Sequence, residues 1–273
     1  MHWEDAPTSA PLPGAPRALD RTLAMWDADR IRAAVARLPS WRQVLDLKGV
    51  ATPGRFDVAP HLDAFDLPPS FAGRRVLDVS ASSGWFSFLA EARGAETVAA
   101  DLPSWADQDF PTWYRRKTLA ELAPDALTAL DHDYVHGPFE LARDVLGSRV
   151  LRLRSRVYDL AEKASGRFDF ALFHDGLDRL RDPVRALEAI AGVLTPQGMA
   201  VVAVPIDDAA PGAVARFFED PSEPTWWRPT PETLAAWCRM AGFPRVELRG
   251  RFRLEARREP AFSETVQVVH ARF

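Results

Sequence analysis

Residues 75–105, RVLDVSASSGWFSFLAEARGAETVAADLPSW, are the stretch that determines which fold this chain can adopt. The opening RVLDV is a short apolar run typical of a buried parallel strand. Small residues at 80–84, SASSG, allow the backbone to turn sharply and to approach a ligand. Apolar residues then recur at helical spacing as far as Gly94, and ETVAAD at 96–101 predicts a second strand. The stretch is therefore predicted to form a strand, a tight turn, a helix and a strand.

An acidic residue closes the second predicted strand. Asp101 lies 23 residues beyond Asp78. Nucleotide-binding βαβ units carry an acidic residue roughly 20 residues past the glycine-rich turn, where it binds ribose hydroxyls. Asp101 is therefore a candidate ribose ligand, and the alternative is a solvated carboxylate at a strand end.

Strand and helix patterns alternate along the rest of the chain. Further strands are predicted within 150–160, 168–173, 199–205, 245–252 and 264–273, and helices within 18–38, 139–147, 181–194 and 231–241. The last two strands have the alternation of an antiparallel pair. This order predicts an α/β fold with a Rossmann-like, doubly wound sheet of seven strands, one of them antiparallel.

The chain is predicted to have three parts. Residues 1–17 are rich in proline and small residues and are expected to be flexible. Residues 18–69 are expected to form a helical extension, either a packing element at a sheet edge or a lid or dimer element. Residues 70–273 are expected to form the α/β domain. A homodimer is left open.

Composition narrows the classes of function. The 273 residues include 34 basic and 38 acidic ones, a net charge of −4, so the chain lacks the basic balance typical of nucleic-acid-binding proteins. One cysteine, Cys238, excludes an internal disulfide and a cysteine-based metal cluster. The N-terminus has no secretory pattern and no apolar stretch is long enough to span a bilayer, so we expect a cytoplasmic protein that does not insert into membranes.

Several strings resemble one family. They are KGVATPGRFD (48–57), RRVLDV (74–79), DLPSW (101–105), RVYDL (156–160), FDFALF (168–173), LRDPVRALEAI (180–190) and PTWWRPTPETLAAWCRMAGF (224–243). Together they resemble class I S-adenosylmethionine (SAM)-dependent methyltransferases. Within these they are most similar to the branch that contains the tRNA wobble-uridine (5-carboxymethoxyuridine) carboxymethyltransferase. The resemblance covers residues 45–245, in the order expected for the family.

The resemblance implies a cofactor site at the carboxyl ends of the strands. SAM, and its product S-adenosylhomocysteine, would lie between the turn after the first strand, the end of the second strand and the turn after the third. Asp101 would accept hydrogen bonds from both ribose hydroxyls, and Asp159 and its neighbours would meet the adenine edge. The implied cofactor-binding residues are Asp78, Ser80, Ala81, Ser82, Gly84, Asp101, Leu102, Tyr158, Asp159 and Phe173.

The turn departs from the family pattern. Members usually carry glycine where this chain has Ser80, and an acidic or polar residue around positions 82–83, so only Gly84 remains as glycine. A serine adds a Cβ and a hydroxyl and disfavours positive φ. We expect SAM binding to persist, with Ser82 or Ser83 bonding the amino-acid part of the cofactor. A displaced or lost cofactor is the alternative.

The residues after the fourth strand are the candidates for catalysis. Relatives have Tyr-His where this chain has Asp178 and Arg179, and this chain has His174 and Asp175 instead. A histidine with a near-neutral pKa can remove a proton from a hydroxyl during methyl transfer. We predict His174 as the base, with Asp175 or Asp178 as an orienting or substrate contact. The alternative is a histidine that lines the cleft without a proton role.

Aromatic side chains suit a sulfonium cofactor and a planar acceptor. The predicted substrate-binding residues are Trp105, Trp113, Tyr114, Arg179, Trp226 and Trp227. Lys48 and Arg55 are either anion contacts or solvated loop charges. No metal site is predicted, because His132, Asp133 and His136 do not match an established ligand spacing.

Three functions follow. We expect a SAM-dependent methyltransferase that acts on a small, hydroxyl-bearing metabolite as a tailoring enzyme. One alternative is an enzyme that modifies a tRNA wobble uridine. The other is a degenerate methyltransferase-fold protein with a role other than methylation, an alternative that rests on the serines of the 80–84 turn.

Overall fold

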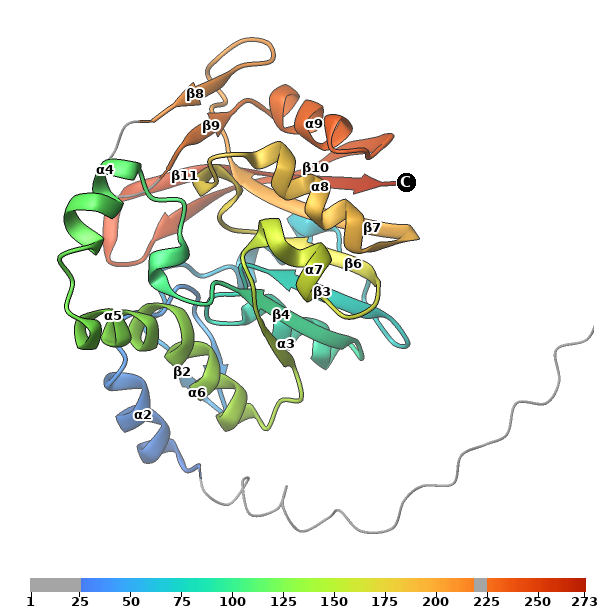
Figure 1. Cartoon of the computed structure of the whole chain (residues 1–273). Coiled ribbons are helices and arrows are strands. Elements are labelled where there is room, and N and C mark those ends of the chain that lie inside the picture. The colour runs from blue at the N-terminus through green and yellow to red at the C-terminus, as the bar shows by residue number, and fades with distance from the viewer. Residues whose placement is uncertain (1–25, 219–224) are drawn as a thin grey trace, which may run out of the picture.

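A computed structural model describes residues 26–218 and 225–273 of the chain. Its centre is a twisted seven-stranded sheet with the strand order β10-β11-β7-β6-β3-β4-β5 (Figure 1). The strands are β3 (Arg75–Val79), β4 (Glu96–Asp101), β5 (Leu151–Arg154), β6 (Phe168–Phe173), β7 (Leu194–Pro205), β10 (Arg245–Ala256) and β11 (Glu259–Arg272). β11 pairs antiparallel with both β7 and β10, whereas β3 to β7 pair in parallel. The predicted doubly wound sheet with one reversed strand is confirmed.

The central stretch folds as its sequence predicts. β3 spans RVLDV, and α3 (Trp85–Ala92) begins directly after Gly84. Strand β4 then spans ETVAAD and runs parallel to β3. One boundary differs, because β7 begins at Leu194 rather than at Met199. Residues 194–198, which precede the predicted strand, belong to β7 as well, with a register shift between β6 and β7.

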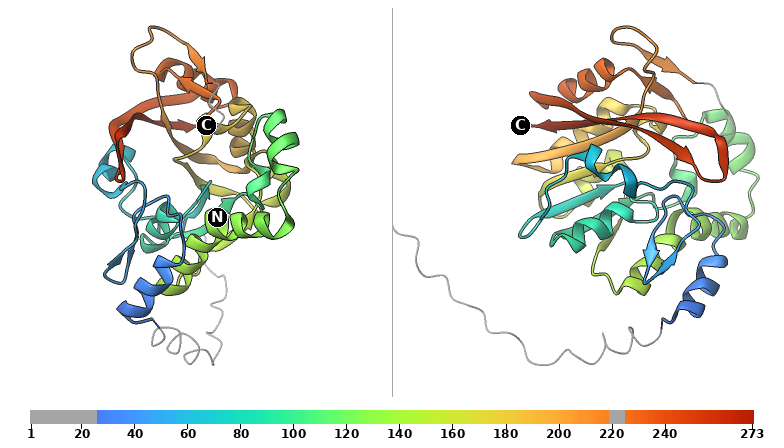
Figure 2. Two further views of the ribbon diagram at one scale, coloured as in Figure 1. Left: turned by 90° about the vertical axis from the view of Figure 1, so that its left-hand side faces the viewer. Right: turned by 180° about the vertical axis from the view of Figure 1, so that it is seen from behind.

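Helices cover both faces of the sheet (Figures 1 and 2). On one face, Leu77 and Val79 of β3 pack into a core with α7 (Leu160–Lys163), α8 (Pro183–Val193) and α9 (Pro231–Met240). On the other face, Val76 packs with α3 and the 3-10 turn η1 (Ala59–Phe65). Apolar burial on both faces explains why the central strands are almost uniformly apolar.

A long connection between β4 and β5 carries helical segments of its own. They are η2 (Trp105–Asp107), α4 (Thr112–Tyr114), η3 (Arg115–Leu119), α5 (Pro124–Leu130), η4 (Asp131–His136) and α6 (Gly137–Leu146). We refer to residues 102–136 as the insert. α6 packs back on the sheet, with Phe139 fully buried. A second extension after β7 is the small hairpin of β8 (Ala215–Phe217) and β9 (Trp227–Pro229).

The segment before β3 packs against the sheet domain. The predicted flexible segment 1–17 and the start of the predicted helical region lie outside the described residues. The described part has α2 (Ala28–Ala36), whose Ile31 and Val35 share a core with α6, and the short pair β1 (Asp46–Leu47) and β2 (Val50–Ala51). A lid or dimer role for this region stays a prediction.

Candidate active site

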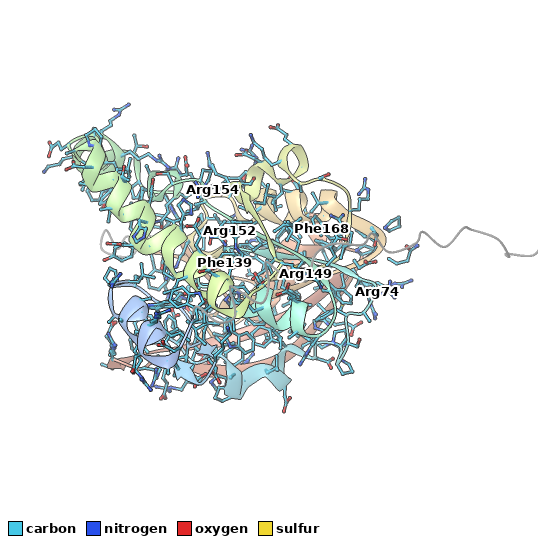
Figure 3. All side chains as sticks on the ribbon, turned by 90° about the horizontal axis from the view of Figure 1, so that it is seen from below. Arg74, Phe139, Arg149, Arg152, Arg154 and Phe168 are labelled. Atoms are coloured by element: carbon cyan, nitrogen blue, oxygen red, sulfur yellow. The ribbon has the colours of Figure 1, made fainter. Side chains whose placement is uncertain are left out.

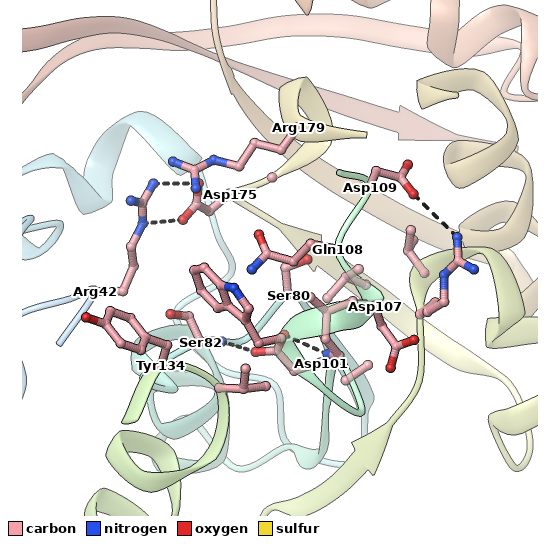
Figure 4. A pocket seen from close by; sticks show the side chains of 18 of the residues that line it. Arg42, Ser80, Ser82, Asp101, Asp107, Gln108, Asp109, Tyr134, Asp175 and Arg179 are labelled. Atoms are coloured by element: carbon pink, nitrogen blue, oxygen red, sulfur yellow. Dashed lines mark hydrogen bonds and ion pairs between the residues drawn. The ribbon is translucent and has the colours of Figure 1, made fainter. Parts of the chain in front are cut away.

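A cavity of about 400 Å³ opens where β3, β4, β5 and β6 end. Parallel sheets bind ligands at this edge, beside the strand where the order of connections reverses. Its lining comes mainly from the segment before β3, the turn after β3, the insert, the turn after β5 and the turn after β6. Figure 4 shows Arg42, Asp175 and Arg179 together at one end and Asp109 at the other, with Ser80, Ser82 and Asp101 between them.

The turn after β3 keeps a glycine-type backbone although two of its residues are serines. Ser80 has φ of 58°, Ser82 has φ of 55° and Gly84 has φ of 93°. A Cβ on Gly84 would lie 2.6 Å from Phe88 and 2.7 Å from Phe139, so only glycine fits there. Ser80 and Ser82 both line the cavity. Holding serine in this left-handed conformation costs backbone strain, of about 1–3 kcal/mol at each of Ser80 and Ser82.

Asp101 stands at the centre of the cavity. Its Oδ2 accepts hydrogen bonds from the backbone N–H of Ser82 at 2.7 Å and from Nη2 of Arg152 at 3.1 Å. Its Oδ1 accepts one from the N–H of Leu102 at 2.8 Å. A carboxylate offers about four acceptor positions, so one position on Oδ1 remains for a ligand. Accepting both ribose hydroxyls, as the resemblance implies, would require one present donor to move.

A partly buried ion pair forms one end of the cavity. The guanidinium of Arg42 binds Asp175 in a two-pronged contact, Nη2 to Oδ1 at 2.8 Å and Nε to Oδ2. Their side chains are 18% and 21% exposed and both residues line the cavity, so the pair is accessible to a ligand there. Burial works against ionisation of Asp175, but the charges of Arg42 and Arg179 outweigh it and hold the pKa of Asp175 well below its usual range. Asp175 is therefore an ionised acceptor and a weak base.

His174 does not line the cavity. Its ring packs on Phe86, with ring centroids 4.3 Å apart, and its Nε2 lies 2.9 Å from Nε2 of Gln43. The Oε1 of Gln43 accepts the N–H of Ser83, so the amide nitrogen donates to the imidazole and the imidazole proton sits on Nδ1. Burial lowers the pKa of His174 to about 4. This placement argues against the predicted base role and makes His174 a support for the 80–84 turn.

The insert is fastened at the opposite end of the cavity by Asp109. Its carboxylate accepts hydrogen bonds from the hydroxyl of Tyr158 at 2.6 Å and from the N–H of Arg181 at 2.8 Å, and Arg156 lies 3.4 Å away. Its backbone carbonyl accepts the indole N–H of Trp226 at 2.6 Å. These contacts tie the insert to the turns after β5 and β6 and to the β8–β9 hairpin.

The structure separates the predicted site residues into two groups. Those that line the cavity are Ser80, Ser82, Asp101, Leu102, Trp105, Tyr114, Tyr158, Asp175 and Arg179. Those outside the lining are Asp78, Ala81, Gly84, Trp113, Asp159, Phe173, His174, Asp178, Trp226 and Trp227. Three of the latter form hydrogen bonds behind the cavity wall. The indole N–H groups of Trp226 and Trp227 donate to backbone carbonyls of the insert and of Arg181, and the backbone carbonyl of Asp178 accepts the backbone N–H of Trp226. Trp113 is half exposed at the surface.

Asp78 and Asp178 are buried behind the cavity wall. Burial raises the pKa of Asp78 to about 7, although the Ser87 hydroxyl donates to it at 2.5 Å. Burial likewise raises the pKa of Asp178 to about 6, against the opposing charge of Arg179. Neither carboxyl group faces the space where an acceptor would lie.

Sequence reasoning missed several lining residues. They are Arg42, Gln108, Asp109, Phe110, Tyr134 and Arg156. Most belong to the insert or to the segment before β3, where no periodic pattern marks a side chain as facing the cavity. Arg55, which the sequence left as either an anion contact or a surface charge, lines the cavity and pairs with Glu259 at 3.2 Å.

Residues 26–218 and 225–273 contain no group of three or more histidine, cysteine or carboxylate side chains placed to hold a metal ion. Nor do they include a helix with the length and apolarity needed to cross a bilayer.

Comparisons with known proteins agree with this geometry. A family model described as a methyltransferase domain matches residues 55–248, which is most of the chain. A tRNA U34 carboxymethyltransferase of Azotobacter vinelandii (strain DJ / ATCC BAA-1303) is 28% identical over 231 residues. The match covers 80% of this chain and 60% of that protein, so the chain spans about three fifths of the length of this relative.

Solved structures show the same fold. The N-terminal domain of EvdMO1 with S-adenosylhomocysteine (SAH) bound has a TM-score of 0.59 at 18% identity, over 90% of this chain and 97% of that one. The same domain in the presence of SAH and D-fucose has a TM-score of 0.60 at 18% identity, over 91% of this chain and 98% of that one. At this identity the likeness concerns the fold.

We predict that glycine at either strained serine stabilises the protein. Ser80→Gly and Ser82→Gly should each raise the free energy of unfolding by about 0.5–1 kcal/mol. The relief of strain in the left-handed backbone conformation should exceed the cost of the extra conformational entropy that glycine gives the unfolded state. Urea denaturation measures the change. Ala81→Gly, between them and without a positive φ, is the control and should destabilise. Lower stability in both serine variants would contradict the strain argument.

We also predict that His174 stays neutral through the physiological range. Because its folded pKa lies near 4, below the usual histidine value of 6.5, protonation should appear only as the pH falls towards 4. Two-dimensional ¹H–¹⁵N NMR of the imidazole nitrogens should show a proton on Nδ1 and constant shifts from about pH 5.5 to 8. A titration centred near the usual histidine value would contradict this and return His174 to the role of base.

Proposed function

The chain belongs to the methyltransferase domain family and is a SAM-dependent methyltransferase, and from this premise we propose that its acceptor is a small molecule with an acidic hydroxyl group. The single observation that carries the proposal is the cavity of about 400 Å³ beside Asp101. Small-molecule sites are typically cavities of a few hundred Å³ with a few convergent polar groups.

The residues present fit the cofactor. Asp101 has one acceptor position directed at the cavity for a ribose hydroxyl. Leu102 and Val157 offer apolar contacts for an adenine ring. The Arg42–Asp175 pair presents a cation and an anion side by side, which matches the carboxylate and ammonium of an amino-acid group. The turn at 80–84 keeps the backbone path that lets a ligand approach closely.

When bound, SAM supplies a methyl group on a positively charged sulfur. The chain's task is to hold the acceptor oxygen in line with that group, because alignment is the main source of rate in a direct displacement. Trp105, Phe110, Tyr114 and Tyr134 line the cavity from the insert and provide aromatic surfaces. Aromatic faces attract a cationic centre and pack on a planar acceptor.

The side chains that line the cavity indicate that the acceptor hydroxyl must be acidic. No histidine is among the described residues that line the cavity, and Asp175 is held ionised as a weak base. An acceptor therefore has to lose its proton without a strong base, which favours a phenolic or enolic hydroxyl over an alcohol. Asp175 keeps acceptor positions besides the two that Arg42 fills, so we propose that it accepts the hydrogen bond of this hydroxyl as well as that of the cofactor ammonium.

A second candidate is modification of a tRNA wobble uridine. One observation favours it, the 28% identity to a tRNA U34 carboxymethyltransferase. The charge of the cavity weighs against it, because four arginines and four aspartates line the cavity and cancel. A polyanionic RNA requires an excess of positive charge, whereas a balanced cavity suits a zwitterionic cofactor and a small acceptor.

The first test of this proposal is cofactor affinity. Isothermal titration should show that the protein binds both SAM and SAH, and Asp101→Ala should weaken SAH binding by about ten- to a hundred-fold, because a charge-assisted hydrogen bond in a partly buried site is lost. Asp63→Ala, which removes an exposed carboxylate from η1, is the matched control and should bind as the wild type does. Absence of binding to both compounds would overturn the proposal.

The second test separates the two acceptor classes. Fluorescence anisotropy with labelled tRNA should show no binding at low salt, where phosphate contacts are strongest. A mixture of phenols incubated with the protein and SAM should yield methylated products detectable by mass spectrometry. Tight tRNA binding that weakens steeply with added salt would favour the wobble-uridine alternative.

A further inference from the structure

Arg152 lies under the cavity in a row of three residues that crosses the sheet. Asp78 of β3 pairs in register with Ala99 of β4, and Ala99 pairs with Arg152 of β5. Residues in register on neighbouring strands point to the same face. Ala99 is fully buried and has only a methyl group, so the long side chain of Arg152 can extend across it towards β3.

The guanidinium of Arg152 is buried and held on several sides. Its side chain is 7% exposed, and Nη2 donates to Asp101 Oδ2 and to the carbonyl of Val135, both at 3.1 Å. The guanidinium carbon lies 4.2 Å from the ring centroid of Phe139, and Figure 3 shows the two side chains next to each other beneath the sheet. Nε and Nη1 are buried and have no hydrogen-bond partner among the described residues.

Burying this positive charge costs free energy unless neighbouring groups stabilise it. A buried guanidinium cannot lose its proton, so it stays charged and must be stabilised by its surroundings. Two buried carboxyl groups lie within its reach, Asp101 by direct contact and Asp78 through space. The charge of Arg152 opposes the effect of burial on the pKa of Asp78. Arg152 is thus the counter-charge for both acidic residues that flank the 80–84 turn.

We propose that Arg152 is a positioning residue for cofactor binding: it fixes the Asp101 carboxylate so that its remaining acceptor position faces the ribose. This inference rests on the proposed binding of SAM. Arg152 holds Oδ2 together with the N–H of Ser82, and this orients Oδ1 towards the cavity. Without Arg152, Asp101 would keep only backbone donors from the turn and from Leu102.

The neighbouring arginine of the same strand provides a contrast. Arg154 is 54% exposed and pairs with Glu140 at 3.2 Å on the surface of α6. Figure 3 shows both side chains in the region of the edge strand β5. A purely structural arginine on this edge would resemble Arg154, because exposed ion pairs add little to stability. Burial against Phe139 and contact with Asp101 distinguish Arg152.

A double-mutant cycle tests the proposal. SAH affinity is measured by isothermal titration for the wild type, Arg152→Met, Asp101→Asn and the double variant. Methionine keeps an apolar contact with Phe139 and removes the charge. Arg152→Met should weaken SAH binding about ten-fold when Asp101 is present and less than about two-fold when asparagine replaces it, because coupled residues are not additive. Arg154→Met is the control and should leave affinity unchanged.

Rescue and folding controls complete the experiment. Arg152→Lys should recover part of the affinity, since it restores a positive charge near Asp101 but not the planar guanidinium that lies on Phe139. If Arg152→Met does not fold, Arg152→Lys and Arg152→Gln are compared with Asp101 present and with Asp101→Asn. The Arg152→Lys variant should bind SAH more tightly than the Arg152→Gln variant only where Asp101 is present. Equal losses in both backgrounds, or no loss, would overturn the positioning role while leaving the proposed function intact. No SAH binding by the wild type would overturn both.

Discussion

The turn after β3 is the constraint on which the rest of the site depends. The chain passes from β3 to α3 within residues 80–84 and adopts positive φ at three of these five positions. That path exposes backbone N–H groups, and other segments bind them: Asp101 accepts from Ser82 and Gln43 accepts from Ser83. Because these donors are fixed by the turn, the end of β4 and the segment before β3 are fixed relative to it. A glycine-type backbone is thus maintained by contacts, even though two of its residues are serines.

The middle and the two ends of the cavity are built by different means. The middle lies at the tips of β3, β4 and β5, whose relative positions follow from parallel register. Both ends are assembled from the segment before β3, the insert and the turns after β5 and β6. Arg42 reaches Asp175 across a gap of 133 residues in sequence, and Asp109 of the insert reaches Tyr158 across 49. Each of these contacts is a single polar interaction between loops rather than part of a ladder.

This difference explains what the sequence could predict. The doubly wound seven-stranded sheet, the presence of one reversed strand and the place of Asp101 at a strand end follow from apolar runs and from the spacing of a βαβ unit, because strand register leaves little freedom. His174 was predicted to be the base on its position after β6, but the Gln43 amide and the ring of Phe86 hold it behind the wall. Arg42 and Arg152 were missed, since neither the loop before β3 nor the LRLR pattern of an edge strand reveals which arginine is buried.

The same difference limits what similarity to other proteins can say about the acceptor. Proteins at 18% identity show only that the fold is shared. Both ends of the cavity consist of loop residues, whose contacts the fold alone does not determine. Arg42 and Asp175 neutralise each other at one end, as Arg156 and Asp109 do at the other end. A desolvated charge must be paired. A charged group of a ligand therefore has to bind one member of such an ion pair and take the place of that member's present partner. A zwitterion can do so at the Arg42–Asp175 pair without leaving either side chain unpaired, whereas a chain of phosphates would leave the aspartates facing like charge.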